Sequence, residues 1–253
     1  MRDKILRLLV PLFFWTAVWQ LAAMGVGQEL LLPTPVAVLE RLFTLAGVGT
    51  FWQTAGLTLL RIFCGILFGV ITGALLAVLT CAFKAADWIL TPMVKIIRAT
   101  PVASFIILVM LWVTRTYVPG LISALMVMPV IWGNVCKGIR ETDKSLLELA
   151  RAYRFGRGKT LRLVYIPSVM PYFSAGVNTS LGLAWKAGVA AEVLCLPRPS
   201  IGTELYNAKQ YLETPSLFAW TLVVILLSFL LEKAVSLLLR AGERNENGRN
   251  RNN

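Results

Sequence analysis

Two ionisable residues of opposite sign, Lys186 and Glu192, lie inside one long apolar stretch of this chain. A charge at the centre of a bilayer costs at least ~2.5 kcal/mol and normally faces a cavity or a partner. Six residues turn an α-helix by about 240°, so the two side chains do not share a face. We hypothesise that Trp185, Lys186 and Glu192 line a translocation pathway in which Lys186 favours an anionic solute.

Other placements of these charges remain open. Lys186 could neutralise a carboxylate on another helix, or extend to the headgroups with Trp185 beside it. Glu192 could be merely interfacial, near the outer end of its span. Arg61 lies near the outer end of another apolar stretch, where extension of its side chain to the headgroups explains it.

Side chains that commonly support catalysis or metal binding are scarce. The chain has no histidine, and its four cysteines form no Cys-x-x-Cys pair. No Gly-x-x-x-x-Gly-Lys-Ser/Thr segment is present, so the chain cannot hold ATP in the P-loop manner. We therefore expect no cofactor, no metal site and no enzymatic activity.

The composition is that of a membrane protein. Hydrophobic residues make up 57% of the 253 residues, and the mean hydropathy is +0.70. The sequence predicts an all-α polytopic fold in one transmembrane domain, residues 1–240, with about six spans and a disordered tail, residues 241–253. The six predicted spans are Ile5–Met24, Thr54–Ala82, Trp88–Val113, Val118–Cys136, Val169–Leu196 and Leu217–Leu239.

Local signals refine this outline. Gly65, Gly69 and Gly73 recur every four residues, so they share a helix face and allow close approach of another helix. Pro92 and Pro101 predict a kink or break in the third span. Thr34 and Pro35 predict the start of a short interfacial helix over residues 36–45.

The distribution of basic residues predicts the orientation. The formal net charge is +12. With six spans, nineteen of the 25 Lys and Arg residues fall on the side that holds both termini. Basic residues collect in cytoplasmic loops, so we expect both termini in the cytoplasm. This bias explains the positive charge without nucleic acid as a partner, and no aromatic-basic motif points to RNA.

One polar segment, residues 137–162, separates two apolar stretches. Asp143 or Thr142 can cap a helix beginning at Lys144, and its apolar face would hold Leu146, Leu149, Ala150 and Tyr153. Lys144, Glu148 and Arg151 are spaced for local ion pairs, and Gly156 and Gly158 would end the helix. Such a helix is too short to cross a membrane, so its apolar face meets either headgroups or protein.

The segment resembles the loop of ABC-importer permeases. Their pattern is Glu-Ala-Ala, three residues, Gly, nine residues and Ile-x-Leu-Pro; here Glu148-Leu149-Ala150 and Pro167 occupy its ends at the family spacing. Arg154 stands at the family's glycine position, which is a departure. Further similarity to the nitrate/sulfonate/taurine branch comes from Leu32-Pro-Thr-Pro35, Thr58-Leu-Leu-Arg61, Arg98-Ala-Thr-Pro101, Gly182-Leu-Ala-Trp185 and Ala190-Ala-Glu192.

The resemblance implies a type I importer permease in the cytoplasmic membrane. It implies two copies around one solute pathway, two cytoplasmic ATPase subunits and an extracytoplasmic solute-binding protein. The helix over residues 144–156 would couple to the ATPase, through Leu146, Glu148, Leu149, Ala150, Arg151, Tyr153, Gly156 and Pro167. A sulfonate, taurine, nitrate or a thiamine-precursor pyrimidine fits the branch. From another class, a secondary carrier remains the alternative.

Overall fold

The computed structural model describes residues 2–251, with side chains described for Arg7 and residues 9–239. Every regular element in this range is a helix, which confirms the predicted all-α fold. The helices are α1 (Arg2–Val26), α2 (Pro35–Ala46), α3 (Gly49–Ala82), α4 (Lys84–Ala99), α5 (Val102–Val109), α6 (Val118–Arg140), α7 (Lys144–Ala152), α8 (Arg157–Thr160), the π-helical turn η1 (Leu161–Tyr165), α9 (Ile166–Cys195), α10 (Ile201–Gln210) and α11 (Thr214–Arg251).

Fewer helices meet the length and hydropathy of a membrane span than the six predicted. Four do so in the described part of the chain, in α1, α3, α6 and α11, and the bent pair α4–α5 raises the count to five if it is one span. The remaining predicted span, α9, has 30 residues. Its polar residues, among them Lys186, Glu192 and Asn178, lower its hydropathy.

The third predicted span, Trp88–Val113, is broken rather than continuous. α4 and α5 meet at an angle of 105°. Thr100, between them, is extended (φ −76°, ψ 131°), which is the conformation favoured before a proline. Pro101 therefore sets the break that the sequence predicted, whereas Pro92 lies inside α4 without ending it.

One compact unit comprises Met1–Thr58 and Leu196–Leu226. Thr34 caps α2 by accepting from the backbone N–H of Ala37, with Pro35 in the first turn, which confirms the predicted short helix. Arg41 of α2 bonds Glu213 (3.1 Å) and Ser216 (2.7 Å) near the start of α11. Phe218 of α11 stacks on Trp19 of α1.

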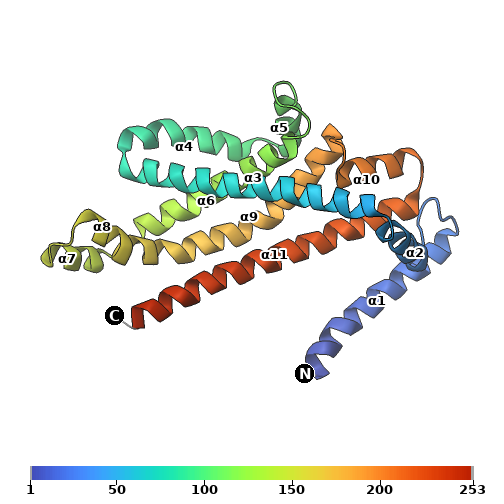
Figure 1. Ribbon diagram of the computed structural model, residues 1–253, viewed down its shortest axis with the longest axis horizontal. Coiled ribbons are helices and arrows are strands. Elements are labelled where there is room, and N and C mark those ends of the chain that lie inside the picture. Colours follow the sequence, from blue (N-terminus) through green and yellow to red (C-terminus); the bar gives the residue numbers. More distant parts are fainter. Residues whose placement is uncertain (1, 252–253) are drawn as a thin grey trace. The chain divides into compact units, whose positions relative to one another are not determined.

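The other unit comprises Leu59–Cys195 and Leu227–Asn253, and it holds the closely packed helices α6 and α9 (Figure 1). α3 approaches α6 along the predicted glycine face. A Cβ on Gly65 would lie 2.1 Å from the carbonyl oxygen of Gly120, and one on Gly73 would lie 2.6 Å from that of Met128. The glycines thus permit backbone contact that any side chain would prevent.

The last helix, α11, continues to Arg251 through most of the segment predicted to be a disordered tail. Residues 252–253, and all side chains from residue 240 onward, lie outside the described part of the chain. Disorder of the tail therefore stays a prediction.

Candidate functional site

The polar segment folds into a short amphipathic helix, α7, at one end of the α6–α9 pair (Figure 1). Asp143 is the N-cap, and its Oδ1 accepts from the backbone N–H of Ser145 at 2.8 Å. Thr142 is engaged elsewhere, since its hydroxyl donates to the Gly138 carbonyl at the end of α6. Of the two predicted caps, the structure uses Asp143, at the predicted position.

The end of α7 differs from the prediction. The helix stops at Ala152, not at Gly156, and Arg154 takes a left-handed conformation with φ 50°. The N–H of Phe155 bonds the carbonyl of Ala150, and that of Arg154 bonds the carbonyl of Arg151. This is the Schellman arrangement, which favours glycine at the left-handed position. Arg154 therefore occupies a glycine-type conformation.

Gly156 instead begins the next helix. It is the N-cap of α8, with an ordinary φ of −65°. η1 follows and leads into α9, whose second residue is the exposed Pro167. A π-helical turn accommodates a residue that cannot donate a backbone hydrogen bond, so η1 and Pro167 fit together.

α7 exposes most of its apolar face. Leu146 is 43% exposed, Leu149 52% and Tyr153 71%, whereas Ala150 is buried at 3%. We call Leu146, Leu149 and Tyr153 the exposed stripe. The predicted ion pairs among Lys144, Glu148 and Arg151 do not form in the described part of the chain. A lysine four residues before a glutamate is the weaker order for a helical pair.

A polar cluster joins the helices that support α7. The Tyr172 hydroxyl of α9 donates to the Glu141 carboxylate at the end of α6. Lys137 lies 3.9 Å from Glu141 and 5.9 Å from the centre of the Tyr172 ring. Arg140 lies 3.9 Å from Asp87 of α4. Sequence reasoning missed this cluster because its members lie on separate helices.

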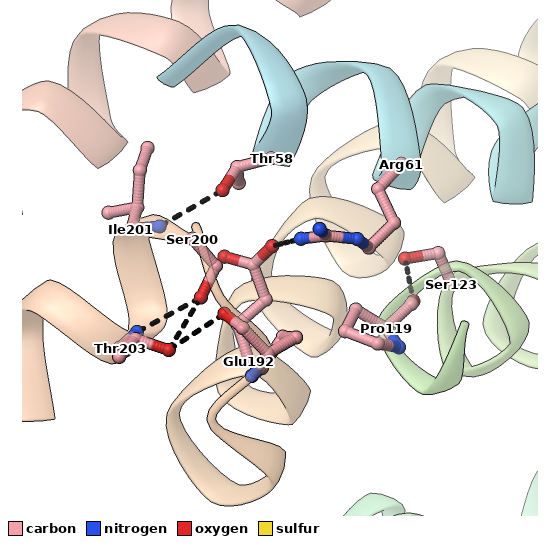
Figure 2. A network of polar contacts seen from close by, with 9 residues as sticks. Thr58, Arg61, Pro119, Ser123, Glu192, Ser200, Ile201 and Thr203 are labelled. Atoms are coloured by element: carbon pink, nitrogen blue, oxygen red, sulfur yellow. Dashed lines mark hydrogen bonds and ion pairs between the residues drawn. The ribbon is translucent and has the colours of Figure 1, made fainter. Parts of the chain in front are cut away.

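The two charged residues of α9, Lys186 and Glu192, have different surroundings. Glu192 is fully buried and pairs with Arg61 of α3 at 2.5 Å, as Figure 2 shows. The Arg61 side chain is 12% exposed. The interpretations of Glu192 as merely interfacial and of Arg61 as extending to the headgroups are therefore wrong. Each charge is instead neutralised by the other across two helices.

Trp185 and Lys186, the other two predicted pathway residues, also differ in burial. Trp185 is 1% exposed and belongs to the core, whereas Lys186 is exposed and has no salt bridge with any described residue. Next to Trp185 in the chain, the Ala184 carbonyl accepts from the Ser123 hydroxyl of α6 (3.1 Å), which also donates to the Pro119 carbonyl (2.9 Å); Figure 2 shows the latter bond. Of the three predicted pathway residues, only Lys186 presents a free charged group.

Metal chemistry finds no support in the described residues, since no group of three His, Cys, Asp or Glu side chains is placed to hold an ion.

Comparisons with known proteins agree on one family. The model of the family described as "Binding-protein-dependent transport system inner membrane component" matches residues 65–241, more than half of the chain. The taurine transport system permease protein TauC of Escherichia coli is 28% identical over 89% of this chain and 84% of its own length. A putative aliphatic sulfonates transport permease protein SsuC of Bacillus subtilis is 28% identical over 88% and 82%.

Solved structures agree at the level of the fold. The chain matches one from the crystal structure of an amino acid ABC transporter with histidines, at a TM-score of 0.59 and 19% identity. That match covers 74% of this chain and 90% of the other. A chain of the inward-facing MetNI methionine ABC transporter matches at a TM-score of 0.56 and 18% identity, over 75% and 93%.

The conformation of Arg154 generates a stability prediction. Arg154→Gly should stabilise the α7 segment by about 1 kcal/mol, because a left-handed residue with a Cβ costs roughly 1–2 kcal/mol. Hydrogen exchange of the amides over residues 144–156 should slow. Ala152→Gly is the matched control, since glycine inside a helix costs about 1 kcal/mol and should speed exchange. Faster exchange in Arg154→Gly would contradict the assignment.

The buried pair generates a second prediction. Glu192→Gln alone leaves Arg61 buried and charged, so it should cost about 3–5 kcal/mol; Arg61→Met should do the same to Glu192. The double variant Arg61→Met with Glu192→Gln should be more stable than either single variant. Thermal unfolding in detergent measures all three. If the two losses simply add, the residues do not act as a pair.

Proposed function

The chain belongs to the family of binding-protein-dependent transport system inner membrane components, so it is a permease subunit of an ABC importer, and we propose that two copies form one solute pathway coupled to ATPase subunits through α7. Like its relatives, the chain is a transport component and not an enzyme. The finer roles that follow rest on the geometry of the site.

The exposed stripe carries the proposal. An apolar face on a helix too short to span a membrane needs a partner surface, and an amphipathic helix lying in a groove is a common mode of protein recognition. The apolar side chains of Leu146, Leu149 and Tyr153 are exposed. The charged side chains of α7 lie on its other faces. We propose that this stripe docks on the ATPase, whereas Glu148 and Arg151 lie on other faces of α7.

The contacts at the base of α7 support a mechanical role for this helix. Asp143, the N-cap of α7, lies two residues after Glu141. The Glu141 carboxylate accepts a hydrogen bond from the Tyr172 hydroxyl of α9. Arg140, one residue earlier, faces Asp87 of α4. A displacement of α7 by the ATPase would therefore act on α4, α6 and α9 together. We propose that this displacement changes the access of the pathway between the two sides of the membrane.

The remaining partners follow from the family. We propose that an extracytoplasmic solute-binding protein delivers the cargo and that both termini face the cytoplasm. The basic segment from Lys137 to Arg162 supports this orientation, because positive charge is retained on the cytoplasmic side. The α7 end of the molecule would then be the cytoplasmic end.

The solute we propose is a small anion. Relatives named for taurine and aliphatic sulfonates transport carry the suggestion, and a bicarbonate transport system permease protein of Synechococcus elongatus is 24% identical over 76% of this chain. Lys186, exposed and unpaired with any described carboxylate, supplies the positive charge. A thiamine-precursor pyrimidine would need no such charge. The secondary-carrier alternative is weakened because Glu192, its candidate ion-coupling carboxylate, is paired with Arg61.

Docking through the exposed stripe is tested by co-purification with the ATPase. Leu149→Glu and Tyr153→Ala should each reduce recovery of the ATPase at least tenfold, because a buried anchor residue contributes about 2 kcal/mol or more. Lys144→Ala changes an exposed side chain on the face of α7 opposite the stripe, and it serves as the control. ATPase recovery that stays at the wild-type level with normal membrane insertion would remove α7 from the interface.

Solute preference is tested at Lys186. Lys186→Met should lower uptake of radiolabelled taurine in proteoliposomes about tenfold, as for a lost charge contact of ~1.4 kcal/mol, whereas Lys186→Arg should retain most of it. ATP hydrolysis in the absence of solute should not change, which separates the pathway from coupling. Equal uptake by wild type and Lys186→Met would place Lys186 outside the pathway.

A further inference from the structure

Two cavities lie beside η1 and share part of its side-chain surface. The first is an apolar groove of about 420 Å³ between the ends of α3 and α6 and the start of α9; its walls include Val78, Ile139, Val169 and Phe173. The second, of about 470 Å³, lies between α7 and α8, with Arg151, Arg157 and Thr160 among its walls. Leu161 and Tyr165 line both cavities, so the two cavities are adjacent.

Their chemistry is complementary. The apolar groove is lined mainly by aliphatic and aromatic side chains, together with the thiol of Cys81. The second cavity carries two guanidinium groups, and neither Arg151 nor Arg157 has a salt bridge to a carboxylate in the part of the chain that is described. Within a few residues of η1, the surface therefore changes from hydrocarbon-like to cationic. Both volumes lie in the roughly 300–1,000 Å³ range of ligand sites.

We propose that the two cavities together form one binding site for an anionic phospholipid. Its acyl chain would occupy the groove beside Val78 and Phe173, and its phosphate would lie between Arg151 and Arg157. Guanidinium groups bind phosphate oxygens with two parallel hydrogen bonds. Basic pockets between membrane helices on the cytoplasmic side are suited to anionic headgroups, and each buried methylene adds to the affinity.

Neither half of the site suffices for another ligand. Free phosphate would use the arginines but leave the adjoining groove empty of any partner. A neutral lipid would use the groove but leave the two cationic side chains unpaired. A ligand with an apolar chain joined to an anionic headgroup satisfies both cavities on either side of Leu161 and Tyr165, and an anionic phospholipid of the membrane supplies both parts.

The site adjoins α7 without using the exposed stripe. Arg151 and Ala150 of α7 line the cationic cavity, whereas the stripe residues Leu149 and Tyr153 do not. A lipid there would support α7 from the side that faces η1 and leave the stripe free for the ATPase. The inference rests on the proposed cytoplasmic placement of α7, but lipid binding in a nanodisc depends on neither the orientation nor the ATPase interface.

The test measures lipid retention by the full chain in complex with its ATPase. The delipidated complex is placed in nanodiscs of phosphatidylcholine, with or without phosphatidylglycerol, and bound lipid is counted by native mass spectrometry after release. Arg157→Gln removes a headgroup ligand, and Val78→Trp fills the groove. The matched controls are Arg162→Gln, which removes the same charge beside the cavity, and Leu75→Trp, on the exposed side of α3.

We expect phosphatidylglycerol to be retained in preference to phosphatidylcholine, and its apparent affinity to fall about tenfold in Arg157→Gln and in Val78→Trp but not in the controls. Equal retention of the two lipids would overturn the proposal. Equal loss in test and control variants would do so too, as would displacement by inorganic phosphate alone or absence of lipid whenever the ATPase is bound. The permease without its ATPase, measured in parallel, distinguishes a failed lipid site from a failed ATPase interface.

Discussion

Helices in hydrocarbon gain little from burying apolar side chains against one another, because lipid tails are equally apolar. Close backbone contact and paired polar groups must therefore hold the bundle together, and the unit built on α3, α6 and α9 shows both. Gly65, Gly69 and Gly73 bring α3 against the backbone of α6 at distances that leave no room for a Cβ. Arg61 and Glu192 join α3 to α9, and their charges neutralise each other where Glu192 is fully buried. The rest of the unit depends on this close approach.

The packed helices α3, α6 and α9 support the short helix α7, which lies outside them. α7 has only nine residues and cannot be stable through its own hydrogen bonds. It is defined by the Asp143 cap at one end and the Arg154 reversal at the other. The Tyr172–Glu141 bond and the Arg140–Asp87 pair connect its base to the spanning helices. These contacts hold the base of α7 against α4, α6 and α9.

The two charged side chains of α9 lie in different environments because they project from different faces of the helix. Glu192 faces α3 and is buried, whereas Lys186, six residues earlier and about 240° around the helix, points away from that contact. One helix thus carries a buried, paired carboxylate and an exposed lysine that has no salt bridge with any described residue. The same polar residues reduce its hydropathy below that of the other spans, which is the expected consequence for a helix that faces protein or a pathway more than lipid.

The sequence by itself determined the features that depend on local spacing. The apolar stretches, the glycine face of α3, the break at Pro101 and the start of the helix at Lys144 all follow from neighbours within a few turns. The end of α7 was not predicted correctly from the sequence, because Gly156 and Gly158 looked like the residues that end the helix. The helix ends earlier, where Arg154 takes a left-handed conformation and the Phe155 N–H bonds the Ala150 carbonyl. Tertiary structure alone decided that Arg61 pairs with Glu192, that Trp185 is core, and that Tyr172 meets Glu141. Such contacts join residues far apart in the chain, and their geometry is set by how closely whole helices approach, which no local pattern records.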